Sequence, residues 1–478
     1  MGEVTAVSQK LFIIGIEGAS YDLIVSLMKE DKLPNLSKLL KDGKVLNLTS
    51  ELPLVSPVTW TSFATGVNPG RHGIFGWQQC DPYTYETYIP LSSDIKEKTF
   101  WRILSEHGKK AIIINMYLTY PPEEVNGTII SGMPSPHLAA YPKSLEDELE
   151  KEGYKLEAKG YVDTPKDEFL SDLYDTTEKR ARTALKLMRS EKWDLFFVLF
   201  TGIDRIQHYL WKDMEKNSKY GEEIPRYYQF IDEKIGELIG QAGDIPILIV
   251  SDHGFRRVEK RFHLNHWLIE EGYLKLKPTP KNFVKTLLLK TSTFIKKIRL
   301  NDLFLNLFKK LGKKPSETMV LNFDIDYEKT KAFTCAFYEP GIYINKRMNE
   351  DLREKLINEI TQKLKKVKDP ESDVPIFKEI RRSSEIYDGS FTDLSPDILL
   401  VTEKNYSAVG GFTFSGLLES NLKETGTHEY GGFMILKGLR PKSKNASLED
   451  IATSILSFFG IKAEHSDGVP GFTPIFEK

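Results

Sequence analysis

The sequence predicts an α/β fold built on a mostly parallel central sheet that helices flank. Three apolar runs, at 10–16, 193–200 and 247–250, are rich in branched or aromatic side chains and have the pattern of parallel strands buried on both faces. Segments with helical periodicity alternate with these runs, as in βαβ units. Each run ends abruptly in polar residues, and open α/β sheets bind ligands at the carboxyl ends of their strands. We therefore expect a functional site at that edge of the sheet.

The composition excludes several classes of protein. The 478 residues are 40% apolar and 28% charged, which is typical of one globular, enzyme-sized unit. A formal net charge of -2 argues against nucleic acid as the main partner. The first ten residues lack the apolar core of a signal peptide, and no apolar run approaches the ~20 residues that a membrane span needs. The two cysteines, Cys80 and Cys335, lie far apart in sequence, so we expect no disulfide and a cytoplasmic location.

The first apolar run, 10–16, ends at Glu17, which places a carboxylate at a strand end. Helical patterns follow at 21–29 and 33–41, and the second has a proline near its start and a glycine after its end. The chain thus begins as a βαβ unit.

The segment that follows contains a candidate nucleophile. Ser56 precedes Pro57, and Gly66 comes ten residues after Ser56, so an N-cap serine, an N1 proline and a C-terminal glycine bracket a short helix. A hydroxyl at a helix N-terminus faces unpaired backbone N–H groups and the positive end of the dipole, which favours an alkoxide or a bound phosphoryl group. Ser56 is therefore either a nucleophile or only a helix cap.

Two acid and histidine pairs follow the other two apolar runs. After 193–200, Asp204 and His208 are four residues apart, so one turn of helix would put both on one face, a spacing suited to chelating a metal. After 247–250, Asp252 and His253 stand side by side before a glycine that permits a sharp turn. The alternatives are a solvated Asp204 beside an unrelated histidine, and an Asp252 that caps a helix.

A further histidine lies near the end of the chain. His428 sits in the glycine-rich segment GTHEYGG, beside an expected strand at 433–436. It could complete a set of three metal ligands.

The rest of the chain divides into core elements and insertions. The other expected core elements are helices at 97–107, 174–189, 226–242 and 447–459 and strands at 111–115 and 128–131. Residues 258–410 are expected as an inserted α+β subdomain, while 1–257 and 411–478 form the metal-binding catalytic core. Within the insertion we expect strands at 332–345 and 397–401 and a helix at 349–367.

A basic stretch at 275–314 holds twelve lysines and arginines against one acid, Asp302, with apolar residues interleaved. Two amphipathic helices there could make a weak contact with an anionic membrane surface or a lipid-like substrate. The alternative is a lid whose apolar face packs on the core.

The candidate residues together number three carboxylates, three imidazoles and one hydroxyl. They are Glu17, Ser56, Asp204, His208, Asp252, His253 and His428. This inventory divides into two metal sites, and its mixed oxygen and nitrogen ligands suit Zn²⁺, Mn²⁺ or Fe²⁺ better than Mg²⁺ or Ca²⁺. Two divalent ions, with zinc favoured, would serve phosphoryl transfer by stabilising the charge on the attacking and departing oxygens.

The order and spacing of these motifs resemble the alkaline phosphatase superfamily and, within it, the type I phosphodiesterase/nucleotide pyrophosphatase family. The resemblance covers nearly the whole chain. It rests on IIGIEG at the first strand, SPVTWTSFATG followed by HGI, the spaced Asp204 and His208, SDHG at 251–254 and GTHEYGG around His428. It implies an alkaline-phosphatase-like fold and hydrolysis of a small phosphodiester or nucleotide-type substrate.

The resemblance also implies a role for each candidate residue. Ser56 is similar to the family nucleophile, which forms a covalent phospho-enzyme that water then cleaves. Asp204, His208 and His428 match one metal site. The residues that match the other are Glu17, Ser56, Asp252 and His253.

Two positions depart from the family pattern. Glu17 stands where the family has Asp, and Trp77 stands where it has a phosphoryl-contacting Asn. These departures leave a degenerate, metal-retaining binding protein as an alternative function. A phosphomonoesterase or phosphonate hydrolase is another. A sulfatase is not expected, because no arginine completes the C/S-x-P-x-R pattern after Ser56.

The arginines near the motifs favour a diester over a monoester. Enzymes that prefer a monoester usually set a cation against its third non-bridging oxygen. Arg205 follows Asp204 directly and is expected to point about 100° away from the ligand face of its helix. Arg71 comes after the nucleophile helix has ended.

Overall fold

The computed structural model describes residues 9–160, 164–216, 218–283, 323–335, 340–412, 416–464 and 466–474. Its largest feature is a nine-stranded sheet with the strand order β20-β2-β18-β9-β1-β8-β5-β6-β7. In that order the strands are β20 (Asn445–Ser447), β2 (Lys44–Thr49), β18 (Gly432–Lys437), β9 (Ile247–Ser251), β1 (Leu11–Ile16), β8 (Leu195–Phe200), β5 (Ala111–Met116), β6 (Gly127–Ser131) and β7 (Ala140–Tyr141).

The middle of this sheet is parallel, as the sequence predicts. β9, β1, β8, β5 and β6 run in one direction, and every residue of β1, β5, β8 and β9 is buried. β18 lies antiparallel to β9 and β2, and β7 lies antiparallel to β6. The mostly parallel α/β fold class is therefore confirmed. β2 was not expected, because its alternating buried and exposed residues lack the continuous apolar run of the central strands.

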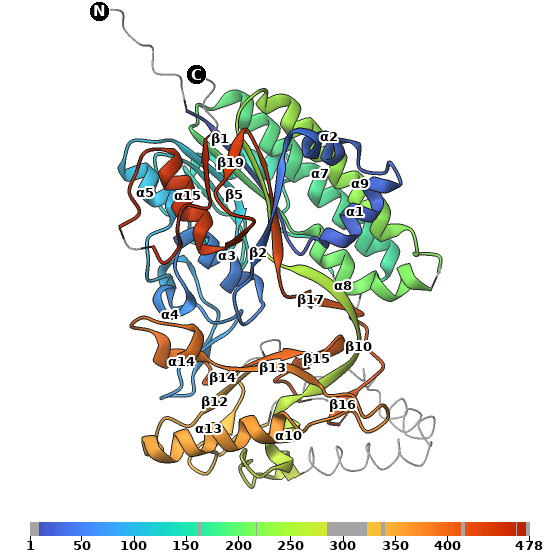
Figure 1. Cartoon of the computed structure of the whole chain (residues 1–478), viewed down its shortest axis with the longest axis vertical. Coiled ribbons are helices and arrows are strands. Elements are labelled where there is room, and N and C mark those ends of the chain that lie inside the picture. Colours follow the sequence, from blue (N-terminus) through green and yellow to red (C-terminus); the bar gives the residue numbers. More distant parts are fainter. Residues whose placement is uncertain are drawn as a thin grey trace, which may run out of the picture.

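Helices cover both faces of the sheet (Figure 1) and make two apolar cores. One face carries α1 (Tyr21–Lys29), α2 (Pro34–Asp42), α7 (Lys166–Ser190), α8 (Gly202–Glu215) and α9 (Glu223–Ala242). The other carries α3 (Ser56–Thr65), α5 (Phe100–Glu106) and α15 (Glu449–Phe458). Among the helices that the structure describes, none combines the length and apolar character required to cross a membrane.

The chain between β9 and β18 builds two smaller sheets below the central one in Figure 1. The first joins β15 (Asn405–Val409), β10 (Gly254–His263) and β16 (Leu418–Glu419), with β17 (Gly426–Glu429) paired to the start of β10. The second has the order β11 (Ala332–Phe333), β12 (Gly341–Ile344), β14 (Ile398–Thr402) and β13 (Phe377–Arg382). α10 (Leu264–Glu270) and α13 (Glu350–Leu364) pack with these strands in a third apolar core. The exact division at 258–410 stays a prediction.

A disulfide joins Cys80 to Cys335, with their Cα atoms 6.0 Å apart. The expectation of unpaired cysteines is therefore wrong. The bond connects the hairpin of β3 (Gln79–Cys80) and β4 (Thr87–Tyr88) to the segment after β11. The two cysteines are 255 positions apart in sequence, and no local signal indicates their proximity, which arises only when the inserted strands fold back. Residues 284–314, most of the predicted basic stretch, lie outside the described residues.

Candidate active site

All seven predicted site residues converge where the central strands end. β1 leads into Glu17, and β9 leads into Asp252 and His253. β8 leads into α8, whose first turns carry Asp204 and His208 on one face, as their spacing predicts. α3 begins at Ser56, and β17 carries His428 beside the start of β10.

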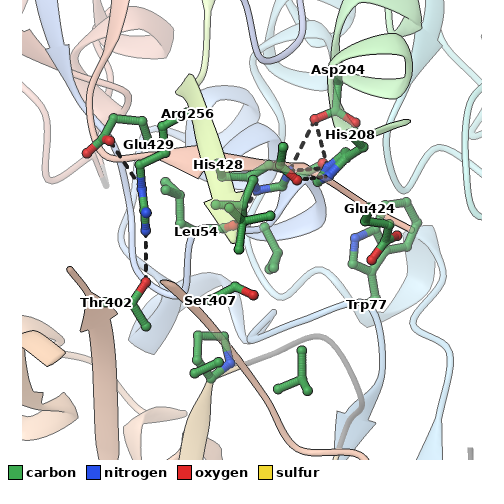
Figure 2. Close-up of a pocket in the computed structure, with 18 of the residues that line it drawn as sticks. Leu54, Trp77, Asp204, His208, Arg256, Thr402, Ser407, Glu424, His428 and Glu429 are labelled. Atoms are coloured by element: carbon green, nitrogen blue, oxygen red, sulfur yellow. Dashed lines mark hydrogen bonds and ion pairs between the residues drawn. The ribbon is translucent and has the colours of Figure 1, made fainter. Parts of the chain in front are cut away.

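A carboxylate and two imidazoles form the tightest part of this cluster (Figure 2). Nε2 of His428 lies 3.1 Å and Nε2 of His208 lies 3.4 Å from Oδ2 of Asp204. The two Nε2 atoms are 3.0 Å apart. Ligand atoms of Asp204, His253 and His428 also lie within 4.8 Å of one another. Donor atoms of both predicted metal sites therefore gather in one small volume.

The protonation of the three rings suits metal binding. In each of His208, His253 and His428, Nδ1 lies 2.7–3.0 Å from a backbone carbonyl oxygen. A carbonyl oxygen only accepts hydrogen bonds, so each Nδ1 carries a proton and Nε2 is the ring atom left to bind a metal. Nε2 of His253 is buried and makes no hydrogen bond among the described residues. Ligand atoms that converge in this way fit a shared cation.

The carboxylates are buried so closely together that they need positive charge to stay ionised. Burial raises the pKa of Glu17 well above its usual value, and Asp204 and Asp252 raise it further. Burial also raises the pKa of Asp252 to about 7, although hydrogen bonds from the Thr59 hydroxyl at 2.6 Å and the Gly18 N–H at 3.3 Å oppose the shift. A set of buried carboxylates and neutral imidazoles is a fitting environment for divalent metal ions.

The pKa shifts of His253 and Asp204 also suit a metal-binding site. Burial and the neighbouring His428 lower the pKa of His253 well below its usual value, so this ring is neutral at pH 7. Burial raises the pKa of Asp204, but the two histidines beside it outweigh this effect and hold the pKa well below its usual value. One ionised carboxylate therefore faces a neutral ring.

Ser56 is the first residue of α3 rather than its N-cap, which is Val55 in extended conformation. The expectation of a capping serine is therefore wrong in this detail. Pro57 and Gly66, whose φ is 73°, take the helix-start and left-handed C-cap positions as expected. The Ser56 side chain makes no capping bond to its own helix, and it lies close enough to Glu17 to lower the pKa of that carboxyl, so it faces the metal ligands.

Two aromatic residues complete this side of the site. The Tyr117 hydroxyl donates to both carboxylate oxygens of Glu17, at 2.9 and 2.8 Å. Trp77 packs edge to face on Tyr117, with ring centroids 5.4 Å apart, and also lines the site. Sequence reasoning missed Tyr117, whose only signal is its position just after a strand.

The position of Arg205 differs from the expectation. Arg205 lines the pocket instead of pointing away, and its Nε lies 2.8 Å from Oε2 of the buried Glu157. Oε1 of Glu157 also lies 3.4 Å from a guanidinium nitrogen of Arg180, so one carboxylate serves two arginines. The helical angle between neighbours gives only the direction in which a side chain starts, and the long arginine side chain extends from there to Glu157. Arg71 pairs with Glu97 and Asp467 and does not line the pocket.

The cluster opens into a cavity of about 700 Å³ between the central sheet and the strands of the inserted region. Its base includes Glu17, Ser56, Asp204, His208 and His428. Its opposite wall comes from β10, β14 and β15. A volume of this size holds a ligand much larger than a phosphate ion.

Comparison with protein families gives one match over most of the chain. The model described as type I phosphodiesterase/nucleotide pyrophosphatase matches residues 11–430. No curated protein sequence matches the chain.

Several solved structures share the fold. Phosphonoacetate hydrolase from Sinorhizobium meliloti 1021, in complex with phosphonoacetate, is 16% identical with a TM-score of 0.62, covering 93% of this chain and 94% of that chain. An inactive murine ectonucleotide pyrophosphatase/phosphodiesterase 5, in complex with AMP, is 12% identical with a TM-score of 0.52 and coverages of 96% and 97%. The alkaline phosphatase PafA is 11% identical with a TM-score of 0.55 and coverages of 97% and 98%. At these identities the likeness establishes the fold alone.

Proposed function

Because the chain belongs to the type I phosphodiesterase/nucleotide pyrophosphatase family, we propose that it is a metal-dependent hydrolase of phosphodiester or pyrophosphate bonds. The observation that carries this proposal is the convergence of three imidazole Nε2 atoms with buried carboxylates beside Ser56. A site that only maintained the fold would pair these groups with hydrogen-bond donors.

The donor set divides between two divalent ions. Asp204, His208 and His428 would hold one. Glu17, Ser56, Asp252 and His253 would hold the other. Zinc suits this mixture of imidazole and carboxylate best, with manganese and iron as the other candidates. When bound, the ions would supply the positive charge that stabilises the phosphoryl oxygens during transfer.

Ser56 is the proposed nucleophile. Its side chain lines the cavity beside the Glu17 carboxylate, where Oγ can meet a substrate. Attack of Oγ on phosphorus forms the serine phosphoester, while the bond from phosphorus to the leaving oxygen breaks and that oxygen departs as an alcohol or phosphate. Water then hydrolyses the serine ester, which returns the Ser56 hydroxyl and releases a phosphomonoester.

Thr59 and Tyr117 orient the carboxylates. Each donates a hydrogen bond to one acid, Thr59 to Asp252 and Tyr117 to Glu17, at distances of 2.6–2.9 Å. Such bonds fix the direction in which a ligating oxygen presents its lone pairs.

A second candidate function is hydrolysis of a phosphomonoester or phosphonate. The observation that favours it is the presence of the Arg205 guanidinium at the pocket, where it could meet a third anionic oxygen. Its ion pair with Glu157 weighs against this function, because that carboxylate already holds Nε.

The first experiment is metal reconstitution of the purified chain. We expect hydrolysis of bis(p-nitrophenyl) phosphate that requires added zinc or manganese and that a chelator abolishes. Metal binding without turnover of any diester, anhydride or monoester would identify a degenerate binding protein. The cytoplasmic location stays a prediction, and the Cys80–Cys335 disulfide weighs against it, because structural disulfides persist mainly in oxidising compartments.

A further inference from the structure

The cavity wall opposite the metal-binding side chains carries polar groups that the proposed reaction at Ser56 does not use. Arg261 of β10 and Ser407 of β15 are register partners on two parallel strands, and both line the cavity. Figure 2 shows Ser407 and Thr402 on the inserted side of the cavity, across from Asp204, His208 and His428.

Two of these groups are buried without a partner. The hydroxyl of Ser407 and Nε of Arg261 are both inaccessible to solvent and make no hydrogen bond among the described residues. Arg261 as a whole is only 8% exposed. Leaving such a group unpaired is destabilising. A ligand in the cavity could satisfy both groups at once if the side chains that cover these two atoms shift to admit it.

The arginines of this wall are already neutralised. Arg261 donates from a terminal nitrogen to Oε2 of Glu424 at 2.6 Å. Arg256 lies 3.1 Å from Oε2 of Glu429 through Nε, and its other nitrogens donate to Thr402 Oγ1 at 2.8 Å and to a backbone carbonyl at 3.0 Å. Each arginine is matched by one glutamate, so the wall offers hydrogen bonds but no net charge to a ligand.

The cavity lining also includes an apolar surface. It is formed by Leu54, Val258, Leu400, Val401 and Val409. Removing apolar ligand surface from water here is favourable by roughly 25 cal/mol per Å². An anionic group would be desolvated there without an unpaired cation to meet it.

We propose that Arg261 and Ser407 form the subsite for the ester group that remains on phosphorus, and that this subsite selects an uncharged alcohol with an apolar body and a distal hydroxyl. The distal hydroxyl accepts a hydrogen bond from Nε of Arg261 and exchanges a second with Ser407. A second anionic group is disfavoured, because Glu424 and Glu429 stand beside both arginines. This inference rests on the proposed diesterase function and adds the substrate class.

The test compares three p-nitrophenyl phosphodiesters whose second ester group is phenyl, 4-(hydroxymethyl)phenyl or 4-carboxyphenyl. p-Nitrophenolate is the better leaving group in all three, so the second group stays on phosphorus. We expect kcat/KM to be highest for the hydroxymethyl ester, about tenfold above the phenyl ester, and lowest for the carboxyl ester. A hydroxymethyl to phenyl ratio at or below one in the unmodified protein would overturn the proposal.

Variants then assign the preference to the two residues. Ser407→Ala should bring the hydroxymethyl to phenyl ratio close to one. Arg261→Lys keeps a cation beside Glu424 but removes the Nε donor, and should reduce the same ratio. Ser372→Ala is the matched control, because Ser372 is exposed on the inserted region and does not line the cavity. An unchanged ratio in both Ser407→Ala and Arg261→Lys would overturn the subsite.

Failure of the subsite and failure of the proposed function give different results. If all three esters release p-nitrophenol with equal kcat/KM, the diesterase function stands and the subsite is wrong. If none of the three releases p-nitrophenol after metal reconstitution, the diesterase function itself is contradicted.

Discussion

The Tyr117 hydroxyl donates to both oxygens of the Glu17 carboxylate, at 2.9 and 2.8 Å, and both side chains are buried. A glutamate reaches one methylene further than an aspartate and has one more rotatable bond. The tyrosine restricts that freedom by bonding both oxygens of the carboxylate. Glu17 and Tyr117 therefore act as a pair, and the site is built around the longer acid.

The first prediction concerns this pair. Tyr117→Phe should lower kcat/KM by roughly 10–100-fold, because a bond that orients a ligating carboxylate is lost. Glu17→Asp should lower it by a similar or larger factor, because a misplacement near 1 Å costs ~10²-fold. The double variant should be less than additive. Steady-state kinetics with bis(p-nitrophenyl) phosphate provide the measurement.

Tyr273→Phe is the matched control for Tyr117→Phe, since the Tyr273 hydroxyl donates to Glu359 at 2.6 Å in the inserted region, away from the site. Glu17→Asp with full or raised activity would show that the glutamate is only tolerated.

The second prediction tests the nucleophile. Ser56→Ala should abolish turnover while divalent metal binding largely survives, because the other six predicted ligands remain. Activity is measured by p-nitrophenol release and bound metal by elemental analysis. Ser62→Ala serves as a control on the same helix, where the Ser62 hydroxyl contacts the buried His72 at 3.0 Å. Retained activity in Ser56→Ala would assign the attack to another group.

The site residues could be predicted where they directly follow a strand that is recognisable in the sequence. Glu17, Asp204, Asp252 and their histidine neighbours each follow an apolar run whose burial on both faces marks it in the sequence. Parallel strands deliver such residues to one edge of the sheet, so their convergence could be expected before the structure was known.

What could not be predicted depends on contacts between distant segments. Tyr117 and Thr59 reach the acids through hydrogen bonds that span 100 and 193 residues. Glu157 also pairs with Arg205, a residue of another segment of the chain, and no helical spacing reveals this pair. The disulfide belongs to this class too. Local periodicity carries no information on such pairs, because they form only after the sheets pack.

The third prediction concerns stability at low pH. Asp369 is 1% exposed, and although burial raises its pKa, hydrogen bonds from Lys260, the Glu371 N–H and Tyr406 lower it to about 2. The folded pKa lies below the unfolded value of ~3.9, so this carboxylate stabilises the fold above pH ~4 and its contribution is lost as the pH falls through 2.

Asp369→Asn should therefore be less stable than the unmodified protein at pH 7, and the difference should shrink between pH 4 and 2. Urea unfolding midpoints across this range measure it. A difference that stays constant with pH would mean that the charge of Asp369 contributes nothing and that only its shape matters.

The fourth prediction concerns the disulfide between Cys80 and Cys335. Replacing both cysteines with serine should lower the free energy of unfolding by about 2–4 kcal/mol, because the bond restricts the unfolded chain. Reductant should lower the melting temperature of the unmodified protein and leave that of the double variant unchanged. Two free thiols in the unfolded, unreduced protein would contradict the bond.

The last prediction concerns the diester against the monoester. Arg205 lies at the cavity, but Glu157 holds its Nε at 2.8 Å and also pairs with Arg180. A third anionic oxygen would have to compete with that carboxylate, whereas a second ester group meets the neutral wall of the inserted region. We therefore expect a higher kcat/KM for bis(p-nitrophenyl) phosphate than for p-nitrophenyl phosphate under the same metal conditions.

Glu157→Gln removes the competing charge and tests this reasoning directly. Arg205 is then released toward the cavity, so the ratio of diester to monoester kcat/KM should fall. Adding Arg205→Met to Glu157→Gln should restore the ratio, because the released cation is then absent. Both kcat/KM values are measured on one preparation. A loss of folded protein lowers both by the same factor and leaves their ratio unchanged. A preference for the monoester in the unmodified protein would instead assign Arg205 to the phosphoryl group and favour the monoesterase.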